Sequence, residues 1–318
     1  MAAFPATLAR DLPYRPRLVR LTLATDTRSA RFIESAPAEI FFLLSAAAQY
    51  TGAVVAVRLF DDASPPTIAL FRVISAAGLL MVFSLRSNHA PWTRHDVYAA
   101  ASFGIATALM NLTFYLAIDR LPLGKSVTIE FIGPIAVAAL RTKTVRNSAA
   151  LVLAAGGVVV LGGVELADEP LGLFFLLIAS TMWAGYIVLG SRVAQTDRGV
   201  NGLGVGLVFG AIVIAPFGVG DVGTVLTTPW LLAACVLVGA SSSAIGYGID
   251  QAVMRRIPIR RFSVMLSLLP VTAAVFGFLF LDQTPTRTDL AGMVLVLVGV
   301  AIQERDVIDR RPEVAETP

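Results

Sequence analysis

The sequence predicts an all-α membrane protein with ten transmembrane helices in two inverted five-helix repeats. Three observations lead to this fold class: the composition, a series of ten apolar segments, and a pair of prolines that recurs at a fixed distance. Of the 318 residues, 56% are hydrophobic and 15% are charged, and the mean hydropathy is +0.75. An average soluble domain carries about 25% charged residues, so this composition argues against a soluble globular enzyme.

Each apolar segment is close to the roughly 20 residues that a helix needs to cross a bilayer. In chain order the segments are 38–57, 66–85, 98–117, 124–140, 148–164, 171–191, 203–219, 229–249, 263–281 and 287–303. The fourth is short, and the seventh contains Pro216 near its end. Runs of small residues at 154–157 and 162–163 indicate close packing between helices.

Basic residues between the segments predict the orientation. Cytoplasmic connections of membrane proteins are enriched in Lys and Arg. With the N-terminus inside, the inner connections hold eleven such residues and the outer ones hold four. The outer ones are Arg58, Arg120, Lys125 and Arg287. The connection containing Glu165, Asp168 and Glu169 is acidic and is expected outside. We therefore expect a multi-pass protein of the cytoplasmic (inner) cell membrane, in contact with lipid and with both termini cytoplasmic.

An internal repeat divides the chain. Pro122 and Pro134 recur as Pro258 and Pro270, each 136 positions later. A shift of five spans reverses the direction through the membrane, so the halves are expected to be inverted. Secondary transporters commonly have this plan, with the substrate site between the repeats near the midplane. The predicted parts are a cytoplasmic tail (1–35), a first repeat (36–166), a second repeat (167–303) and a C-terminal cytoplasmic tail (304–318).

Arg72, Glu130 and Asp250 lie inside apolar segments, whereas Glu39 and Asp96 lie at segment starts. A charge at the centre of a bilayer costs at least about 2.5–3.5 kcal/mol. The three interior charges are therefore expected to face a cavity or one another. Both a buried ion pair that holds helices together and the handling of a substrate or ion explain them.

Glu130 is followed by a helix-breaking sequence. Pro134 has no N–H to donate to the carbonyl of residue 130, and Gly133 permits close approach by a neighbouring helix or a substrate. In the second half, Pro270 frees the carbonyl of Leu266 in the same way. We expect a helix break beside Glu130.

Other polar and aromatic residues fall on helix faces that could line the same cavity. Residues three or four apart on a helix are neighbours. The two groups with this spacing are Asn111 with Tyr115, and Tyr247 with Asp250 and Gln251. Trp183 and Tyr186 either line the cavity or anchor packing, and the serines at 241–243 favour helix packing. All these residues, with Arg72 and Glu130, are candidate substrate-binding residues, and Glu130 and Asp250 are also candidate proton-coupling residues.

The sequence lacks the motifs of several classes of enzyme and metal-binding protein. The sequence has no HExxH and no GxxxxGK[ST], and His89 and His95 lie in one connection. A single cysteine, Cys235, excludes a disulfide framework within the chain. We therefore expect no enzyme activity, no metal, no cofactor and no nucleic-acid partner. Because the chain has no nucleotide-binding motif, we expect any transport by it to be driven by a gradient of an ion or of the substrate.

Four stretches resemble the EamA branch of the drug/metabolite transporter superfamily, and most closely its threonine/homoserine exporter group. They are TIALFRVISAAGLL (67–80), MNLTFYLAIDRLPLGKSVTIEFIGPIAVAAL (110–140), WAGYIVLGSRVAQ (183–195) and SSSAIGYGIDQAVMRRIPIRRFSVMLSLLPVTAAV (241–275). The resemblance covers about residues 38–303 and implies the ten-span inverted-repeat fold. It places Glu130 at the acidic position before the fourth-span proline and Asp250 at an acidic position of the eighth span. The group often has Glu directly before its ninth-span proline, where this chain has Leu269.

The leading hypothesis is a secondary active transporter that exports amino acids of the threonine/homoserine kind, or related small polar metabolites, by antiport with protons. In this hypothesis Arg72 pairs with a substrate carboxylate or holds Glu130 in place. One alternative is an exporter of drugs or lipophilic cations, which needs more aromatic lining and does not need Arg72. Another is a membrane scaffold or sensor that transports nothing. The expected partners are a small-molecule substrate and protons, and the chain is a monomer or a homodimer.

The topology is open to a direct test. A reporter that is active only in the cytoplasm, fused after Arg305, is expected to be active, because the basic connections predict an even number of spans. Activity of a periplasmic reporter at the same position would contradict the ten-span arrangement.

Overall fold

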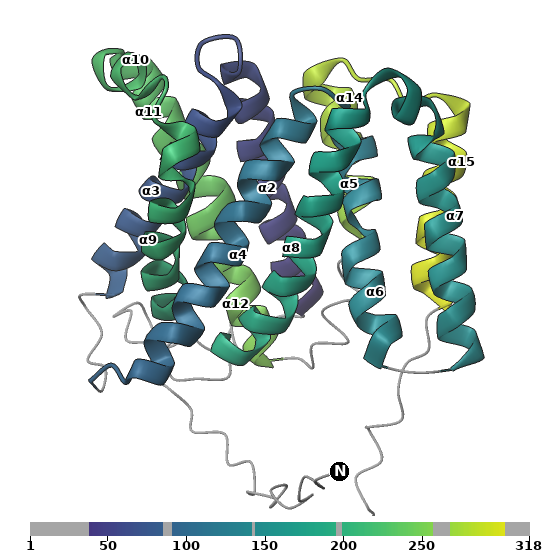
Figure 1. The fold of residues 1–318 in the computed structure, drawn as a ribbon, viewed down its shortest axis with the longest axis horizontal. Coiled ribbons are helices and arrows are strands. Elements are labelled where there is room, and N and C mark those ends of the chain that lie inside the picture. The colour runs from purple at the N-terminus through teal and green to yellow at the C-terminus, as the bar shows by residue number, and fades with distance from the viewer. Residues whose placement is uncertain (1–37, 85–90, 142–143, 195–198, 257–267, 303–318) are drawn as a thin grey trace, which may run out of the picture. The chain divides into compact units, whose positions relative to one another are not determined.

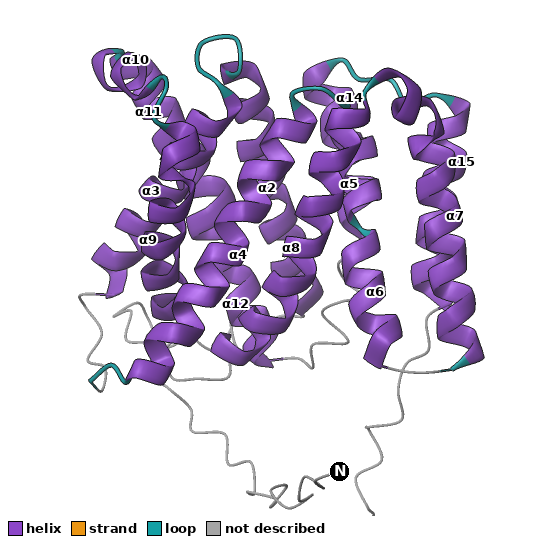
Figure 2. Ribbon diagram, in the orientation of Figure 1, coloured by secondary structure: helices purple, strands orange, loops and turns teal. Residues whose placement is uncertain are grey.

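The computed structural model describes residues 38–84, 91–141, 144–194, 199–256 and 268–302, and the regular structure of these residues is entirely helical (Figures 1 and 2). The predicted all-α class is confirmed for them. By length and composition, six helical stretches in this part of the chain can cross a membrane. They are Ile40–Leu59, Pro65–Val82, Arg94–Ile118, Pro170–Ala194, Val200–Gly218 and Pro229–Met254.

Every predicted apolar segment overlaps one helix or one run of successive helices. The helices are α2 (Ala38–Leu59), α3 (Pro65–Ser84), α4 (Arg94–Ile118), α5 (Leu123–Glu130), α6 (Ile132–Arg141), α7 (Val145–Asp168), α8 (Pro170–Ala194), α9 (Gly199–Gly218), α10 (Val222–Thr227), α11 (Pro229–Val238), η1 (Gly239–Gly246), α12 (Tyr247–Arg256), α14 (Leu268–Leu281) and α15 (Arg287–Ile302). The tails at 1–35 and 304–318 lie outside the described residues.

The structure differs from the expected segments in four places. The fourth segment is two helices, α5 and α6, separated at Phe131. The eighth consists of three consecutive helical stretches: α11, the π-helical stretch η1, and α12. The short helix α10 was not predicted, because six residues are too few to show a period. Glu165 and Asp168 lie in the last turns of α7 and not in a connection, so that part of the prediction was wrong.

Acidic caps define the starts of α4 and α15. The Thr93 hydroxyl accepts a bond from the backbone N–H of Asp96 at 3.1 Å, and the Asp96 carboxylate accepts from the backbone N–H of Thr93 at 3.1 Å. Thr286 and Asp289 form the same reciprocal pair at the start of α15, at 2.9 and 3.1 Å. Each pair satisfies backbone donors that a helix start leaves open. Asp96 therefore has a structural explanation and is not part of an interior site.

Helices from the two halves of the chain pack against each other. α3 contacts α9, α4 contacts both α8 and α9, and α7 lies along α15 (Figure 1). Close approach of α7 and α15 depends on Gly157, where a Cβ would lie 2.7 Å from the Gly292 carbonyl oxygen. This agrees with the close packing expected of the small-residue run. Its neighbour Gly156 has open space beside it.

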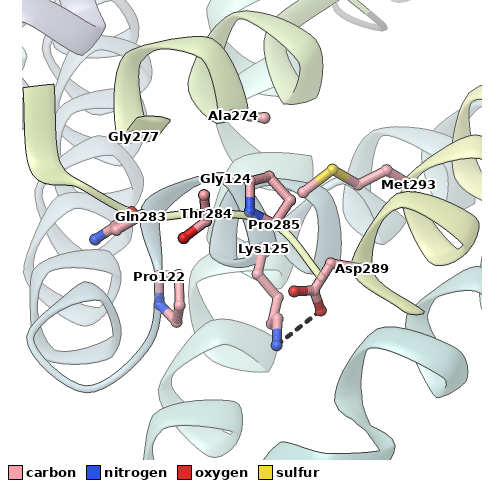
Figure 3. Close-up of a pocket in the computed structure, with 10 residues that line it drawn as sticks. All are labelled: Pro122, Gly124, Lys125, Ala274, Gly277, Gln283, Thr284, Pro285, Asp289 and Met293. Carbon is pink, nitrogen blue, oxygen red and sulfur yellow. Dashed lines mark ion pairs between the residues drawn. The ribbon is translucent and has the colours of Figure 1, made fainter. Parts of the chain in front are cut away.

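A cleft lies where the start of α5 meets the connection between α14 and α15 (Figure 3). Lys125 Nζ and Asp289 Oδ1 are 2.8 Å apart across it, with side chains only 12% and 10% exposed. The side-chain oxygen of Gln283 accepts a hydrogen bond from the backbone N–H of Leu123 at 2.8 Å. These two interactions connect the first half of the chain to the second.

The Lys125–Asp289 ion pair is expected to stabilise the fold more than an exposed pair does. Exposed pairs contribute about 0–1 kcal/mol, whereas breaking a buried pair costs about 3–5 kcal/mol. Lys125→Met is therefore expected to lower the thermal midpoint of the purified protein, because it leaves the Asp289 carboxylate without its cation. Asp289→Asn keeps an acceptor for the helix cap, and the Lys125→Met/Asp289→Asn double variant should be more stable than Lys125→Met alone. Strictly additive losses in this double-mutant cycle would contradict the prediction.

Candidate functional site

A cavity of about 60 Å³ lies between helices from both halves of the chain. Its lining comes from α2, α3, α4 and α5 in the first half and from α8, α12 and α14 in the second. Seven of the nine predicted substrate-binding residues line it: Arg72, Asn111, Glu130, Trp183, Tyr186, Tyr247 and Asp250. The structure thus brings together residues that are up to 178 positions apart in sequence, from Arg72 to Asp250.

Arg72 is buried and is held by neutral oxygens. Its Nε donates to the Ser243 hydroxyl at 2.8 Å, and its Nη1 and Nη2 donate to the hydroxyls of Tyr115 and Tyr247, each at 3.0 Å. The guanidinium carbon also lies 5.2 and 5.6 Å from the ring centres of the two tyrosines, where the π-faces attract a cation. Among the described residues no carboxylate forms an ion pair with Arg72. Its charge is therefore fixed in place without a counter-ion.

Asp250 is also buried, but its carboxylate is well supplied with donors. The Ser45 hydroxyl lies 2.6 Å from Oδ1, and the Tyr186 hydroxyl and the Gln49 side-chain amide donate to Oδ2 at 3.2 and 3.3 Å. Three helices therefore meet at this carboxylate: α2, α8 and α12. Hydrogen bonds to a carboxylate stabilise its charged form.

Glu130 has a different environment from Asp250. It is the last residue of α5, its side chain is 6% exposed, and it lines the cavity. Within the described part of the chain its carboxylate has no hydrogen bond and no ion pair. A buried ionisable group without partners is unfavourable unless something else satisfies it. The Glu130 carboxylate is therefore the group of this site that can accept a hydrogen bond or an ion pair from a ligand.

The break between α5 and α6 positions Glu130. α5 ends at Glu130 and α6 begins at Ile132, as expected from the missing N–H of Pro134. Gly133 then packs directly on α8, because a Cβ there would lie 2.1 Å from the Ser180 carbonyl oxygen. The neighbour that Gly133 admits is therefore a helix and not the cavity. Pro270 is the third residue of α14, while Leu266, whose carbonyl it was expected to free, lies outside the described residues.

Two predicted residues do not line the cavity. Tyr115 is fully buried and acts on the site through its hydrogen bond to Arg72. Gln251 is also fully buried, and neither polar atom of its side chain has a partner among the described residues. It lies near Gly190 of α8, where a Cβ would be 3.2 Å from its Nε2. Its face of α12 differs from that of Asp250.

The aromatic candidates both line the cavity and pack. Trp183 meets Phe131 edge to face at 5.5 Å, and the Tyr186 ring lies 5.3 Å from both Phe103 and Tyr247. Both roles that the sequence left open are therefore present.

Sequence reasoning missed several lining or supporting residues. Ser45 and Gln49 are polar residues one helical turn apart in a largely apolar segment, and this spacing would have indicated a shared polar face. Ser243 was expected only to support helix packing, yet it binds Arg72. The apolar lining residues Ala53, Met110, Phe114 and Val127 carry no comparable signal, since apolar residues occur throughout these helices.

Charged residues among apolar helices are typical of substrate and ion pathways in membrane proteins. Residues 170–303 match the EamA-like transporter family. The chain is 28% identical to the threonine/homoserine exporter RhtA of Salmonella typhimurium (strain LT2) in an alignment of 284 residues that covers 87% of this chain and 94% of that protein. It is likewise 28% identical to RhtA of Escherichia coli (strain K12), over 82% of this chain and 88% of the relative. An uncharacterized transporter of Archaeoglobus fulgidus is 23% identical over 76% of this chain and 89% of that protein. The EamA resemblance seen in the sequence is confirmed.

A solved crystal structure is similar to this chain in fold. It matches with a TM-score of 0.59 at 16% sequence identity, over 86% of this chain and 98% of its own. The fold is therefore not peculiar to this sequence.

The different environments of the two carboxylates predict different effects on stability. Asp250→Asn replaces one accepting oxygen with an NH₂ group that faces hydroxyl and amide donors, and hydrogen bonds to charged groups contribute about 1.5–3 kcal/mol each. We expect a clear fall in the thermal midpoint. The matched change Glu130→Gln removes no hydrogen bond of the described structure and should leave the midpoint nearly unchanged. Equal losses in both variants would contradict this distinction.

Proposed function

We propose that this protein is a secondary active transporter that exports amino acids of the threonine/homoserine kind, or related small polar metabolites, driven by proton exchange. The observation that carries the proposal is that two opposite charges line one cavity and form no ion pair with any described residue: the Arg72 guanidinium and the Glu130 carboxylate. A zwitterion offers a carboxylate to the first and an ammonium to the second. The naming of the RhtA relatives as threonine/homoserine exporters supports the same substrate class.

We further propose the ten-span arrangement in two inverted repeats, 36–166 and 167–303, with both termini cytoplasmic. Adding 136 to the helix bounds of the first half brings α2 onto α8, α3 onto α9, α4 onto the α11–η1–α12 run, and α7 onto α15, with bounds that agree to within six residues. The Tyr247 hydroxyl donates to Asn111 Oδ1 at 2.7 Å, and these residues are also 136 positions apart. Contact between equivalent positions is expected on a two-fold pseudo-axis. The cavity then lies where repeat-based transporters hold their substrate.

Protons are the proposed coupling ion, with Glu130 as the first exchange site and Asp250 as the second. When no substrate is bound, a protonated Glu130 leaves the cavity with one cation, Arg72, and one anion, Asp250. The substrate ammonium forms an ion pair with the ionised Glu130 carboxylate and not with its protonated form. Binding of the ammonium therefore favours release of the proton from Glu130, which links the two movements.

Export of drugs or lipophilic cations is the second candidate. Five aromatic side chains line the cavity: Tyr50, Phe114, Trp183, Tyr186 and Tyr247. They favour a flat or lipophilic cation. A purely cationic substrate, however, gives no reason to keep the buried cation Arg72 beside it.

The proposal predicts a specific defect in Glu130→Gln. In vesicles containing the purified protein, counterflow of radiolabelled threonine should persist at a raised threonine concentration. The glutamine oxygen still accepts a hydrogen bond from the ammonium, and exchange needs binding and alternating access but no net proton movement. Efflux driven by a pH gradient should be lost. Efflux at the wild-type rate in the same vesicles would remove Glu130 from the coupling.

Two variants, Arg72→Lys and Arg72→Ala, test whether Arg72 binds the substrate carboxylate. Loss of charge-assisted bonds of about 1.5–3 kcal/mol corresponds to binding that is roughly tenfold to a hundredfold weaker. We expect Arg72→Ala to raise the half-saturating threonine concentration by at least this factor. Arg72→Lys should recover only part, because an ammonium lacks the two-pronged geometry. Normal threonine counterflow in Arg72→Ala would instead favour the cationic substrate.

A further inference from the structure

We propose that the side-chain amide of Asn111 is a second donor to the substrate carboxylate, so that Asn111 and Arg72 together select carboxylates over the corresponding neutral amides. This inference rests on the proposed function, since it assigns a specificity-determining atom in the same site. It follows from the direction of the hydrogen bonds around Tyr247.

The Tyr247 hydroxyl connects Arg72 to Asn111. A guanidinium can only donate, so the 3.0 Å contact from Arg72 Nη2 uses a lone pair of the hydroxyl. The hydroxyl has one proton, and the contact at 2.7 Å gives it to Asn111 Oδ1. The oxygen of the Asn111 amide is thereby occupied, and its orientation is fixed.

The nitrogen of the same amide has no acceptor. Asn111 is 2% exposed, and its Nδ2 has no hydrogen-bond partner in the described part of the chain. A buried donor without a partner is unfavourable, because it has lost its hydrogen bonds to water. Asn111 lines the cavity, so a ligand oxygen there would satisfy this donor.

Arg72 contributes donors to the same space. Of its five N–H groups, three are used by Ser243, Tyr115 and Tyr247. The two that remain belong to Nη1 and Nη2, and Arg72 lines the cavity with Asn111. Unused donors from both residues thus border the cavity.

A carboxylate matches this arrangement, and a carboxamide does not. A carboxylate has two oxygens that accept only, with about four acceptor sites between them. An amide replaces one oxygen with a donor, which would face other donors and leave them unpaired. Sites built to hydrogen-bond a group reject analogues that cannot form the bond.

The test compares L-threonine with L-threoninamide on the reconstituted full-length protein. Two readouts are used: competition against radiolabelled threonine counterflow, and ligand-induced rise of the thermal midpoint, which measures binding without transport. For the wild type we expect threonine to act at concentrations at least tenfold below those of the amide.

Two variants at Asn111 test the role of its nitrogen. Asn111→Asp keeps an acceptor for Tyr247 and removes both donors, and Asn111→Ala removes the donors without adding charge. Each is expected to need at least tenfold more threonine and to lose most of the preference over threoninamide. The control is Ser126→Ala. It removes another fully buried donor that has no partner among the described residues and does not line the cavity, so it should match the wild type.

The outcomes separate the two proposals. If threonine stabilises the wild type without being transported, and the variants lose the preference for threonine, the proposed export is wrong while the assignment of Asn111 holds. If the wild type distinguishes the ligands and both folded variants do so equally well, the assignment is overturned. A wild type stabilised equally by both ligands overturns it as well.

Discussion

The buried guanidinium of Arg72 is the interaction on which the rest of the site depends. A cation within an apolar segment costs at least a few kcal/mol, and here three hydroxyls and two aromatic rings compensate it. Those groups come from α4, η1 and α12, so solvating this one charge fixes the relative positions of α3 and its neighbours. Because all the compensating groups are neutral, the positive charge remains available to a ligand.

The two halves contribute unequally to the cavity, although their helices correspond. The positions 136 residues after Arg72 and Glu130 are Val208 and Leu266, both apolar. Asp250 in turn corresponds to Phe114. The aromatic pair Tyr50 and Tyr186, by contrast, is retained at equivalent positions, and both tyrosines line the cavity. The proposed repeat thus supplies a common scaffold, and single substitutions give each half its own chemistry.

Much of this architecture could be predicted from the sequence, because membrane spans and buried charges leave strong local signals. Each of the ten apolar segments found from hydropathy overlaps helical structure in the described part of the chain, where six stretches are long and apolar enough to cross a membrane. The cost of intramembrane charge singled out Arg72, Glu130 and Asp250, which line one cavity. Pro134 marked the break after Glu130. What was missed depends on geometry: the π-helical stretch η1 turns Ser243 toward Arg72, and no pattern of residue types reveals that rotation. Gln251 was placed on the cavity by its spacing, but packing near Gly190 directs it elsewhere.

The small volume of the cavity has a consequence for the proposed exporter. About 60 Å³ admits roughly four water molecules, which is less than an amino acid fills. Binding of the cargo therefore requires a wider conformation. The apparent affinity is the affinity of that conformation multiplied by the fraction of molecules that adopt it. A low affinity suits an exporter, because the substrate must also dissociate on the outer side of the membrane. With low affinity, flux is small at low cargo concentration and rises in proportion as cargo accumulates inside the cell, instead of saturating early.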